Sequence, residues 1–254
     1  MESSETRTRD RVIVALAMRR SGHHAVLNQL CYQLKNVLHL NNCVVTENGR
    51  SAPKRGRFRL YNDGLVMDTG KLPGKERYRF TKAKFSRNLL YSFENADISI
   101  DYSKLVERHH AYTTICVVRD PFNWLASLLA WRTAARIERR IRLWKKQVKQ
   151  CLHPETYPHG HFVDVNYNRW VLDRAYRERV SDRLGLDYSE LGLNEVLKFG
   201  VASSFDGTSF HGRGSEMKVL ERYKCFEHDE QYRSFFKDRK LITLSERYFE
   251  FNPW

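Results

Sequence analysis

Residues 12–30 read VIVALAMRRSGHHAVLNQL, and this stretch decides the fold. Its first seven residues form an apolar, β-prone run that predicts a short buried strand. RRSGHH follows as a tight loop, and a helix is expected next because apolar residues recur at intervals of three and four. The helix is expected to run through residue 38, with its buried face made by Val26, Leu27, Leu30, Leu34, Val37 and Leu38. Strand, loop and helix in this order are the repeating unit of an α/β fold.

A similar strand–loop–helix unit begins near residue 112. Residues 112–118 form another β-rich apolar run, and after RDP a helix is expected from about Phe122, with Pro121 in its first turn. Further strands are expected over residues 88–93 and 162–165, a helical segment over residues 168–184, and a candidate fifth strand over residues 241–244. This alternation predicts a three-layer α/β fold, in which a mostly parallel central sheet carries helices on both faces and binds ligands at the carboxyl ends of its strands.

The composition is that of a folded protein without a membrane span. The chain has 254 residues, 41% hydrophobic and 13% aromatic, which is enough for a sizeable core and too much for a disordered chain. Its best apolar run, residues 12–18, is far shorter than the roughly eighteen residues that a transmembrane helix needs. The N-terminus MESSETRTRDR has no secretory hydrophobic region, so a cytoplasmic location is the default expectation. We expect a short tail over residues 1–10 and a single domain over residues 11–254.

The five cysteines are odd in number, widely spaced and never arranged as C-x-x-C. This pattern argues against a disulfide framework and against a cysteine zinc site. Reduced and mostly buried thiols are therefore expected at Cys31, Cys43, Cys116, Cys151 and Cys225.

Positive charge is concentrated in two segments. The formal net charge is +14, and residues 50–87 contain twelve basic and three acidic residues, while residues 131–149 contain eight and one. Such segments attract polyanions, whether nucleotides, nucleic acid, sulfated glycans or acidic membranes, although a solvated surface face has the same composition. Residues 50–87 are expected to form exposed loops or a hairpin around YNDG at residues 61–64, and residues 131–149 are expected to be helical.

The RRSGHH loop has the layout of an anion-binding site. A strand that feeds a glycine turn and then a helix directs backbone N–H groups and the helix dipole at a phosphate. Gly22 permits close approach of the backbone, Ser21 offers a hydroxyl, and Arg20 offers a permanently charged planar donor. The Walker pattern is absent, which disfavours ATP or GTP hydrolysis. An ordinary turn with a surface pair, Arg19 and Arg20, is the alternative interpretation.

This loop resembles that of the sulfotransferases that use 3′-phosphoadenosine 5′-phosphosulfate (PAPS), whose first loop commonly reads K-S-G-T-T or R-S-G-S-T. Arg20, Ser21 and Gly22 match, and His23 and His24 stand at the two hydroxyl positions, where imidazole can still donate a hydrogen bond. The resemblance implies that the 5′-phosphate is held by Arg19, Arg20, Ser21, Gly22, His23 and His24. Metal ligation by the histidine pair is not expected, because adjacent side chains on a helix point apart.

Another signature of this family is an Arg at the end of a central strand and a Ser eight residues later, both contacting the 3′-phosphate. Arg119 and Ser127 have this spacing. The strand end and the second turn of the next helix can face one anion. The alternative is an Arg119–Asp120 pair with Ser127 on a solvated helix face.

Two later segments are similar to other parts of the family's nucleotide site. Tyr167 follows a strand where the family often has a tyrosine against the adenine, and an aromatic ring there can stack on a base. Residues 201–214 resemble the late loop that closes over the 3′-phosphate, with Ser203, Ser204 and Arg213 as candidates. A core tyrosine and a plain surface loop are the alternatives.

Sulfuryl transfer needs in-line attack on sulfur, stabilisation of charge on the bridging oxygens, and usually a base for the acceptor. Arg20 and the loop amides would stabilise the charge. The family's base is a His or Glu at the end of a strand before the Arg–Ser signature, which implies Glu94, with a raised pKa in a partly closed cleft. A helix-start carboxylate is the alternative role of Glu94, and His109 and His110 are competing bases.

The resemblance thus implies a P-loop NTPase-like sulfotransferase fold that transfers a sulfuryl group from PAPS, without a metal, to a hydroxyl or amine of a small-molecule or glycan acceptor. The basic residues 50–87 make an anionic acceptor a hypothesis. A nucleotide-dependent phosphotransferase, which would bind ATP with Mg²⁺, stays open. A nucleic-acid-binding protein would use the net charge and the aromatic Trp131 and Trp144, but it leaves the spacing of Arg119 and Ser127 unexplained.

Overall fold

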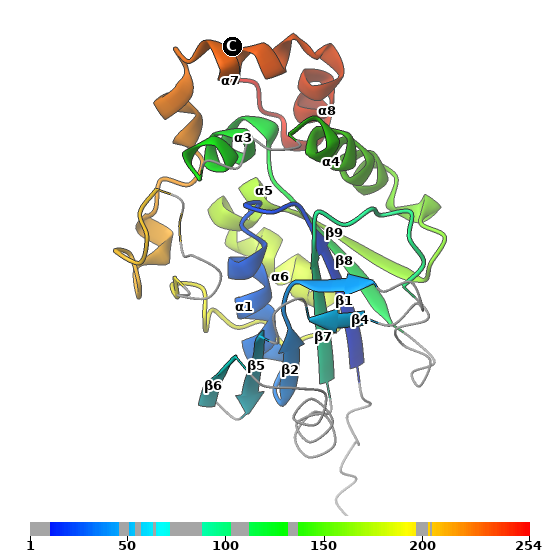
Figure 1. Cartoon of the computed structure of the whole chain (residues 1–254). Helices are drawn as coiled ribbons and strands as arrows, with labels where there is room; N and C mark the ends of the chain where they lie inside the picture. Colours follow the sequence, from blue (N-terminus) through cyan, green and yellow to red (C-terminus); the bar gives the residue numbers. More distant parts are fainter. Residues whose placement is uncertain are drawn as a thin grey trace, which may run out of the picture.

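A seven-stranded sheet forms the centre of the molecule (Figure 1). The computed structural model describes residues 11–45, 51–53, 57–62, 65–71, 88–102, 112–131, 137–196, 203 and 205–254. The strand order is β6-β5-β2-β7-β1-β8-β9, and the strands β2, β7, β1, β8 and β9 are mutually parallel, whereas β5 and β6 add an antiparallel edge. Their bounds are β1 Arg11–Ala17, β2 Val37–Leu40, β5 Arg57–Asn62, β6 Leu65–Lys71, β7 Asn88–Glu94, β8 Thr113–Val118 and β9 His161–Asn166. A separate pair consists of β3, Cys43–Val45, and β4, Ser51–Pro53.

Helices cover both faces of this sheet. One face packs against α1 (His23–Leu34), α5 (Tyr167–Leu172) and α6 (Arg174–Arg183), and the other packs against α3 (Pro121–Ala130), α4 (Ile137–Leu152) and α8 (Arg239–Phe249). Strand β1 supplies alternate residues to the two cores, because successive side chains of a strand point to opposite faces: Val14 and Leu16 pack on one side, Ile13 and Ala15 on the other. The predicted three-layer, mostly parallel α/β fold is confirmed.

Short helical turns complete the C-terminal part of the chain. They are η3 Gly214–Glu216, η4 Arg222–Phe226, α7 Glu230–Ser234 and η5 Phe235–Lys237, and η2 Pro154–Thr156 lies between α4 and β9. No helix in the part of the chain described by the structure combines the length and the apolar character needed to cross a lipid bilayer.

The strand predictions at β1, β7, β8 and β9 are confirmed, and so is the helix after RDP. That helix, α3, begins at Pro121 because Asp120 caps it: the carboxylate of Asp120 accepts a hydrogen bond from the backbone N–H of Asn123 at 2.8 Å. The hairpin around residues 61–64 is also confirmed, since β5 and β6 pair antiparallel on either side of positions 63 and 64, which lie outside the described residues. The tail over residues 1–10 lies outside them as well.

Two element predictions are wrong. The first helix ends at Leu34 rather than at residue 38, because Lys35 and Asn36 have φ angles of 50° and 45°, which stop a right-handed helix. Val37 and Leu38 instead belong to β2, which hydrogen-bonds to β7. Residues 241–244 form no strand: they lie in helix α8, because a four-residue apolar run does not distinguish a strand from the buried face of a helix.

The helical segment predicted over residues 168–184 is two helices, α5 and α6, that meet at Asp173. The backbone leaves helical geometry at Asp173, whose carboxylate accepts a hydrogen bond from Tyr176 N at 3.1 Å and so caps α6. The cysteine prediction is confirmed: all five are thiols, and Cys225 alone among them is exposed.

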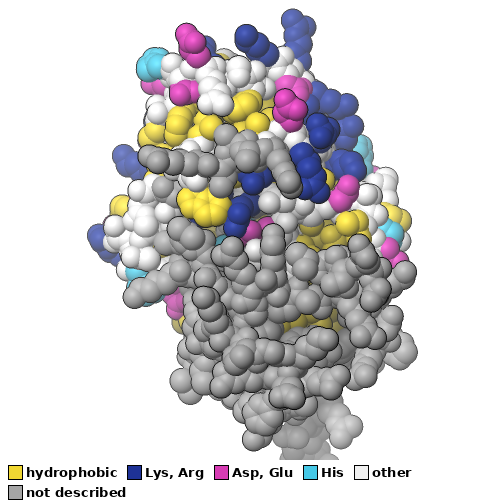
Figure 2. All heavy atoms as spheres, viewed as in Figure 1, with side chains coloured by type: hydrophobic (Ala, Val, Ile, Leu, Met, Phe, Trp, Pro, Cys, Tyr) yellow, Lys and Arg dark blue, Asp and Glu magenta, His cyan; other side chains and the backbone are white. Residues whose placement is uncertain are grey.

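The basic residues 137–149 belong to an amphipathic helix. Helix α4 buries Ile141, Trp144 and Val148 and exposes Arg139, Arg142 and Lys149 along its opposite side. Figure 2 shows Lys and Arg side chains gathered in this upper part of the molecule. Trp144 is 0% exposed, so it is not available to stack on the bases of a nucleic acid. The basic composition of this helix is therefore that of a solvated helix face with a buried aromatic anchor.

Trp144 joins α4 to the sheet and to α8. Its ring stacks at 6.2 Å from the rings of both Trp124 and Phe249, and its Nε1 donates a hydrogen bond to the carbonyl oxygen of Arg119 at 2.9 Å. The side chain thus fills the interior between three helices and satisfies a backbone acceptor at the end of β8.

We predict that Trp144→Ala lowers the free energy of unfolding by about 3–5 kcal/mol, because it leaves a large cavity and an unpaired carbonyl. Leu172→Ala is the control: Leu172 is 76% exposed, so its removal is expected to change stability by less than about 0.5 kcal/mol. Urea denaturation measures both. Equal unfolding midpoints for the two variants would contradict the role assigned to Trp144.

Candidate functional site

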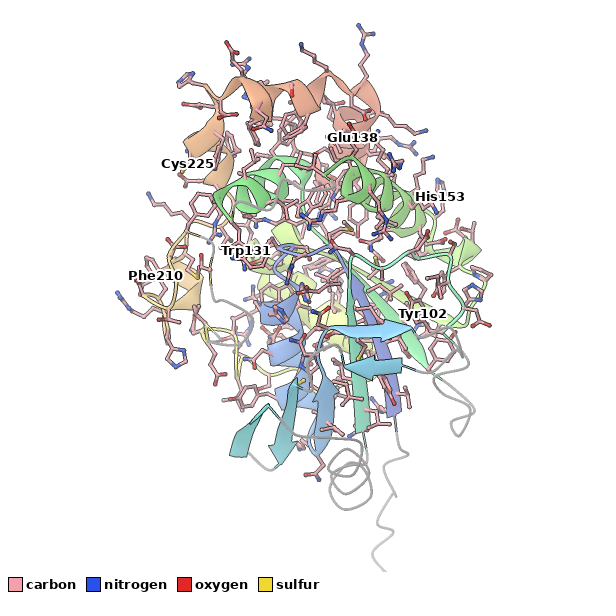
Figure 3. The ribbon with its side chains drawn as sticks, viewed as in Figure 1. Tyr102, Trp131, Glu138, His153, Phe210 and Cys225 are labelled. Atoms are coloured by element: carbon pink, nitrogen blue, oxygen red, sulfur yellow. The ribbon has the colours of Figure 1, made fainter. Side chains whose placement is uncertain are left out.

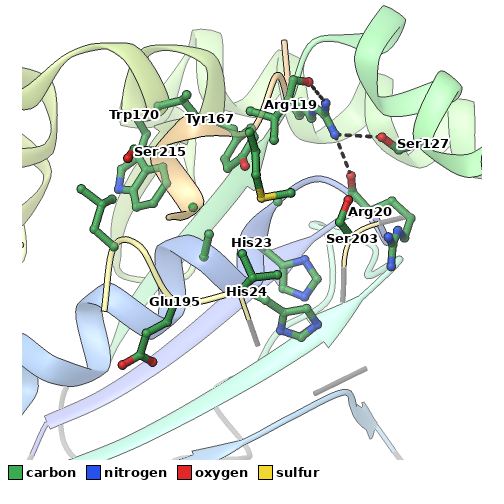
Figure 4. Close-up of a pocket in the computed structure, with 18 of the residues that line it drawn as sticks. Arg20, His23, His24, Arg119, Ser127, Tyr167, Trp170, Glu195, Ser203 and Ser215 are labelled. Atoms are coloured by element: carbon green, nitrogen blue, oxygen red, sulfur yellow. Dashed lines mark hydrogen bonds between the residues drawn. The ribbon is translucent and has the colours of Figure 1, made fainter. Parts of the chain in front are cut away.

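A pocket lies where β1, β7 and β8 end, at the carboxyl edge of the parallel strands (Figure 4). Three groups of its lining residues carry the argument that follows. The first consists of cationic and hydroxyl side chains, the second of aromatic and apolar ones, and the third of two histidines beside a carboxylate. These groups are, in order, Arg20, Arg119, Arg222, Ser127 and Ser203; Tyr167, Trp170, Val171, Leu193 and Met217; and His23, His24 and Glu94.

The loop after β1 brings backbone and side chains to this pocket. Gly22 is the N-cap of α1, with φ of +83°, and the backbone N–H of Ala25 donates to its carbonyl at 3.0 Å. A Cβ atom at Gly22 would lie 2.3 Å from ring carbons of Tyr167, so only glycine lets the loop approach that ring. Ser21 is buried, and within the described part of the chain its hydroxyl has no hydrogen-bond partner. Ser21 does not line the pocket, whereas Arg19, Arg20, Gly22, His23 and His24 do.

Arg119 and Ser127 contact each other, as Figure 4 shows. The guanidinium of Arg119 donates to Ser127 Oγ at 3.0 Å, to the carbonyl of Arg20 at 3.4 Å and to the carbonyl of Val219. Both side chains are almost fully buried, so Ser127 does not lie on a solvated helix face. Asp120, the alternative partner of Arg119, caps α3 instead. Residues eight positions apart, at the end of β8 and in the second turn of α3, are therefore in contact at the wall of the pocket.

Three guanidinium groups line one end of the pocket. Burial and the nearby charge of Arg222 lower the pKa of Arg119 and that of Arg20 to about 10. Burial also lowers the pKa of Arg222, whose guanidinium is held by Asp206 and by Ser203 Oγ, both at 2.9 Å. All three groups remain charged at neutral pH, and their mutual repulsion favours an anion between them.

Arg222 is not predicted by any sequence motif. It lies 99 residues beyond Asn123, whose side-chain oxygen accepts a hydrogen bond from Arg222 N at 2.8 Å and so fixes η4 against α3. Residues 219–227 mix charged, aromatic and aliphatic side chains, and no periodic pattern marks Arg222 as the buried arginine of this segment.

An aromatic wall lies next to these guanidinium groups. Tyr167 is the first residue of α5, directly after β9, and its ring stacks on Trp170 with ring centroids 5.8 Å apart. The guanidinium carbon of Arg119 lies 5.6 Å from the centre of the Tyr167 ring, so the cationic end adjoins the aromatic one. Trp170 is anchored by a hydrogen bond from its Nε1 to Gln29 Oε1 at 3.1 Å.

His23, His24 and Glu94 converge at the mouth of the loop. The Nε2 atoms of the two histidines lie 3.6 and 3.5 Å from Glu94 Oε1, and Arg19 Nε lies 3.2 Å from Glu94 Oε2. The two imidazole centroids are 4.0 Å apart, so the expectation that adjacent histidines point apart is wrong. Both residues lie in the first turn of α1, from which both rings face the end of β7.

The expectation of a raised pKa at Glu94 is also wrong. Burial by itself would raise the pKa of Glu94, but the hydrogen bond from His24 and the charges of the histidines and Arg19 lower it to about 2. Burial lowers the pKa of His23 to about 3, which keeps this imidazole neutral at pH 7. Glu94 is thus an ionised carboxylate fixed by the loop, and a weak proton acceptor.

The other residues predicted to bind the nucleotide or act as the base do not all reach the pocket. Ser203 lines the pocket and accepts a hydrogen bond from Arg222, whereas Arg213 is exposed, pairs with Glu216 at 3.2 Å and does not line the pocket. Ser204, His109 and His110 lie outside the described residues. Trp131, labelled in Figure 3, contacts the loop: the guanidinium carbon of Arg19 lies 4.4 Å from its ring centre.

This chain resembles known proteins in its three-dimensional structure. No protein-family model and no curated protein matches its sequence. The sulfotransferase domain from the Synechococcus PCC 7002 olefin synthase matches with a TM-score of 0.48 and 12% identity, over 90% of this chain and 98% of that domain. The mouse sulfotransferase SULT7A1, complexed with PAP, matches with a TM-score of 0.48 and 11% identity, over 96% of this chain and 86% of that chain. Both neighbours are sulfotransferases, and the roles of residues in this chain rest on its own geometry.

We predict that Gly22→Ala lowers the free energy of unfolding by about 3 kcal/mol, since the new methyl group is strained at positive φ and displaces the Tyr167 ring. Gly212→Ala is the matched control. Gly212 has φ of +82° and no atom within 4 Å of the Cβ position, so only the backbone strain, about 1 kcal/mol, is expected. Urea denaturation of both variants separates the two contributions, and equal losses would show that the Tyr167 contact does not constrain the loop.

Proposed function

We propose that the protein is a PAPS-dependent sulfotransferase, with residues 11–254 acting as one catalytic domain. The observation that carries this proposal is the pair Arg119 and Ser127, hydrogen-bonded to each other in a pocket that also contains Arg20 and an aromatic wall. One end of this pocket suits phosphate and sulfate oxygens, and the other end suits a flat apolar base. A phosphorylated adenine nucleotide has this combination of parts.

The two anionic groups of PAPS have separate sites in this proposal. Arg119 and Ser127 contact the 3′-phosphate, with Arg222 and Ser203 beside them. The 5′-phosphosulfate is contacted by the pocket-lining residues of the loop, which are Arg19, Arg20, Gly22, His23 and His24. Tyr167 and Trp170 stack against the adenine. The first loop lacks the Walker pattern that binds ATP with Mg²⁺, which favours PAPS over ATP.

The reaction would proceed by in-line attack of an acceptor oxygen or nitrogen on sulfur. A bond forms between the acceptor and sulfur, the bond from sulfur to the 5′-phosphate oxygen breaks, 3′-phosphoadenosine 5′-phosphate (PAP) leaves, and the acceptor's proton is released to water. Arg20 and the N–H groups of the loop stabilise the negative charge that develops on the bridging oxygen. Because Glu94 has a lowered pKa, we assign it to holding His23, His24 and Arg19 in place rather than to taking the acceptor's proton.

The proposed acceptor is a small molecule or glycan with a hydroxyl or amine. An anionic acceptor is favoured by the basic residues 50–87, which include the antiparallel strands β5 and β6 at the sheet edge next to β2.

Binding of PAP tests the nucleotide site. By calorimetry we expect PAP to bind the wild type at least about tenfold more tightly than 5′-AMP, since the 3′-phosphate adds charge-assisted hydrogen bonds. In Ser127→Ala and Arg119→Lys this preference is expected to shrink, with the affinity for 5′-AMP less affected. Equal affinity of the wild type for PAP and 5′-AMP, or tighter binding of ATP with Mg²⁺, would refute the proposal.

The aromatic wall is tested by changing Tyr167 in two ways. Tyr167→Phe keeps a stacking ring and is expected to bind PAP within about threefold of the wild type, whereas Tyr167→Leu is expected to lose about tenfold or more. Quenching of tryptophan fluorescence by PAP that is lost in Trp170→Phe, which keeps the other four tryptophans, reports stacking on Trp170. An unchanged PAP affinity in Tyr167→Leu would place the adenine elsewhere.

A further inference from the structure

Three metal-ligating side chains meet beside the cationic end of the pocket. His23 and His24 come from the start of α1, and Glu94 comes from the end of β7, which is parallel to β1 and adjacent to it. One ligand atom from each lies within 4.8 Å of the other two. Figure 4 shows the two imidazole rings side by side in the pocket. Among the residues described, this is the cluster of three histidine, cysteine or acidic side chains that could hold a metal ion.

The two distances from Glu94 to the histidines are close to those of a tetrahedral zinc site. Zinc binds imidazole nitrogen and carboxylate oxygen at about 2.0–2.2 Å, which places neighbouring ligand atoms about 3.3 Å apart in a tetrahedron. Glu94 Oε1 lies 3.6 Å from His23 Nε2 and 3.5 Å from His24 Nε2. Small side-chain adjustments would bring all three atoms onto one ion.

His23 supplies an independent indication of a ligand. Its side chain is 3% exposed, and neither ring nitrogen has a hydrogen-bond partner among the described residues. Burying an imidazole without partners is costly, so unsatisfied ring nitrogens are rare in folded proteins. An ion between His23 and Glu94 would satisfy Nε2, one of these two nitrogens.

We propose that His23 Nε2, His24 Nε2 and Glu94 Oε1 bind one divalent transition-metal ion of the Zn²⁺ type, with a fourth coordination position facing the pocket. Two imidazoles and one carboxylate select such an ion over Mg²⁺ or Ca²⁺, which prefer oxygen ligands. All three ligands line the pocket, so an oxygen of a bound anion can complete the coordination.

The neighbouring arginines fit this arrangement. Arg19 contacts Glu94 Oε2 and leaves Oε1 for the metal, so the arginine orients the carboxylate as an outer partner. Arg20 lies on the same loop and adds positive charge, which an anionic ligand shared by the arginine and the metal would offset. Metal and anion are therefore expected to strengthen each other's binding, by the same factor in both directions.

The site goes beyond the proposed function and does not depend on it. In this chain His23, His24 and Glu94 stand at the two hydroxyl positions of the sulfotransferase loop and at the position of its base. Side chains at these three places converge on one point. The metal site rests on this convergence, whichever nucleotide the pocket accepts.

The test is titration of the chelator-treated full chain with Zn²⁺ alone, by calorimetry, and with Co²⁺, by visible absorption. We expect one equivalent per chain, a strong absorption typical of four-coordinate Co²⁺, and no comparable binding of Mg²⁺. His24→Gln and, separately, Glu94→Gln are expected to weaken Zn²⁺ binding at least about tenfold. Removing a residue that only hydrogen-bonds to a metal ligand already lowers metal affinity by about this factor, and each of these variants removes a ligand itself. Circular dichroism and urea denaturation verify that both variants fold.

The control variants change other groups that bind zinc. His228 is 89% exposed and lies 3.4 Å from Glu227, so His228→Gln removes a surface histidine–glutamate pair, and Cys225→Ser removes the exposed thiol. Both are expected to bind Zn²⁺ like the wild type. Absence of Zn²⁺ binding by the wild type, or binding that is lost in a control and kept in His24→Gln, would overturn the proposal.

Binding of PAP separates this inference from the proposed function. Zn²⁺ binding without PAP binding would support the metal site and refute the nucleotide site. PAP binding without Zn²⁺ binding would support the nucleotide site and refute the metal site. Ser127→Ala provides the internal comparison, since it is expected to weaken PAP binding and to leave the affinity for Zn²⁺ alone unchanged.

Discussion

The buried guanidinium of Arg119 is the interaction on which the pocket depends. It is 3% exposed, and it bonds to the carbonyl of Arg20 in the first loop, to Ser127 on α3 and to the carbonyl of Val219 ahead of η4. A buried charge is tolerated only when it is held by hydrogen bonds, so these three segments must stay close to the end of β8. The backbone carbonyl of the same residue accepts the indole N–H of Trp144, which links the site to the packing of α4.

The charge distribution of the pocket suits an anionic ligand. Arg20 and Arg119 both have lowered pKa values because of burial and the charge of Arg222, and Asp206 pairs with Arg222 at 2.9 Å. Glu94, the carboxylate at the other side of the loop, is engaged by Arg19 and the two histidines. Holding like charges close together lowers the stability of the folded protein, and such destabilising arrangements are concentrated at functional sites.

Much of the fold follows from local patterns in the chain. The buried runs at β1 and β8 and the glycine turn before α1 are each encoded within a few neighbouring residues. The wrong predictions of secondary structure occur where a local pattern is compatible with both a helix and a strand. Val37 and Leu38 continue the helical spacing of α1, but hydrogen bonds to β7 and the positive φ of Asn36 turn them into a strand. Residues 241–244 read as a strand, yet packing against α4 makes them part of a helix.

The sequence by itself determined the α/β class, the glycine loop between β1 and α1, and the spacing that joins Arg119 to Ser127, because each depends on residues no more than a few turns apart. Only the tertiary structure decided that Arg222 and Trp170 enter the same pocket and that Glu94 meets His23 and His24. It also decided the ionisation of Glu94, whose pKa depends on burial and on charges about seventy residues away in the chain. Contacts and burial of this kind arise when distant segments pack together, and no local pattern contains them.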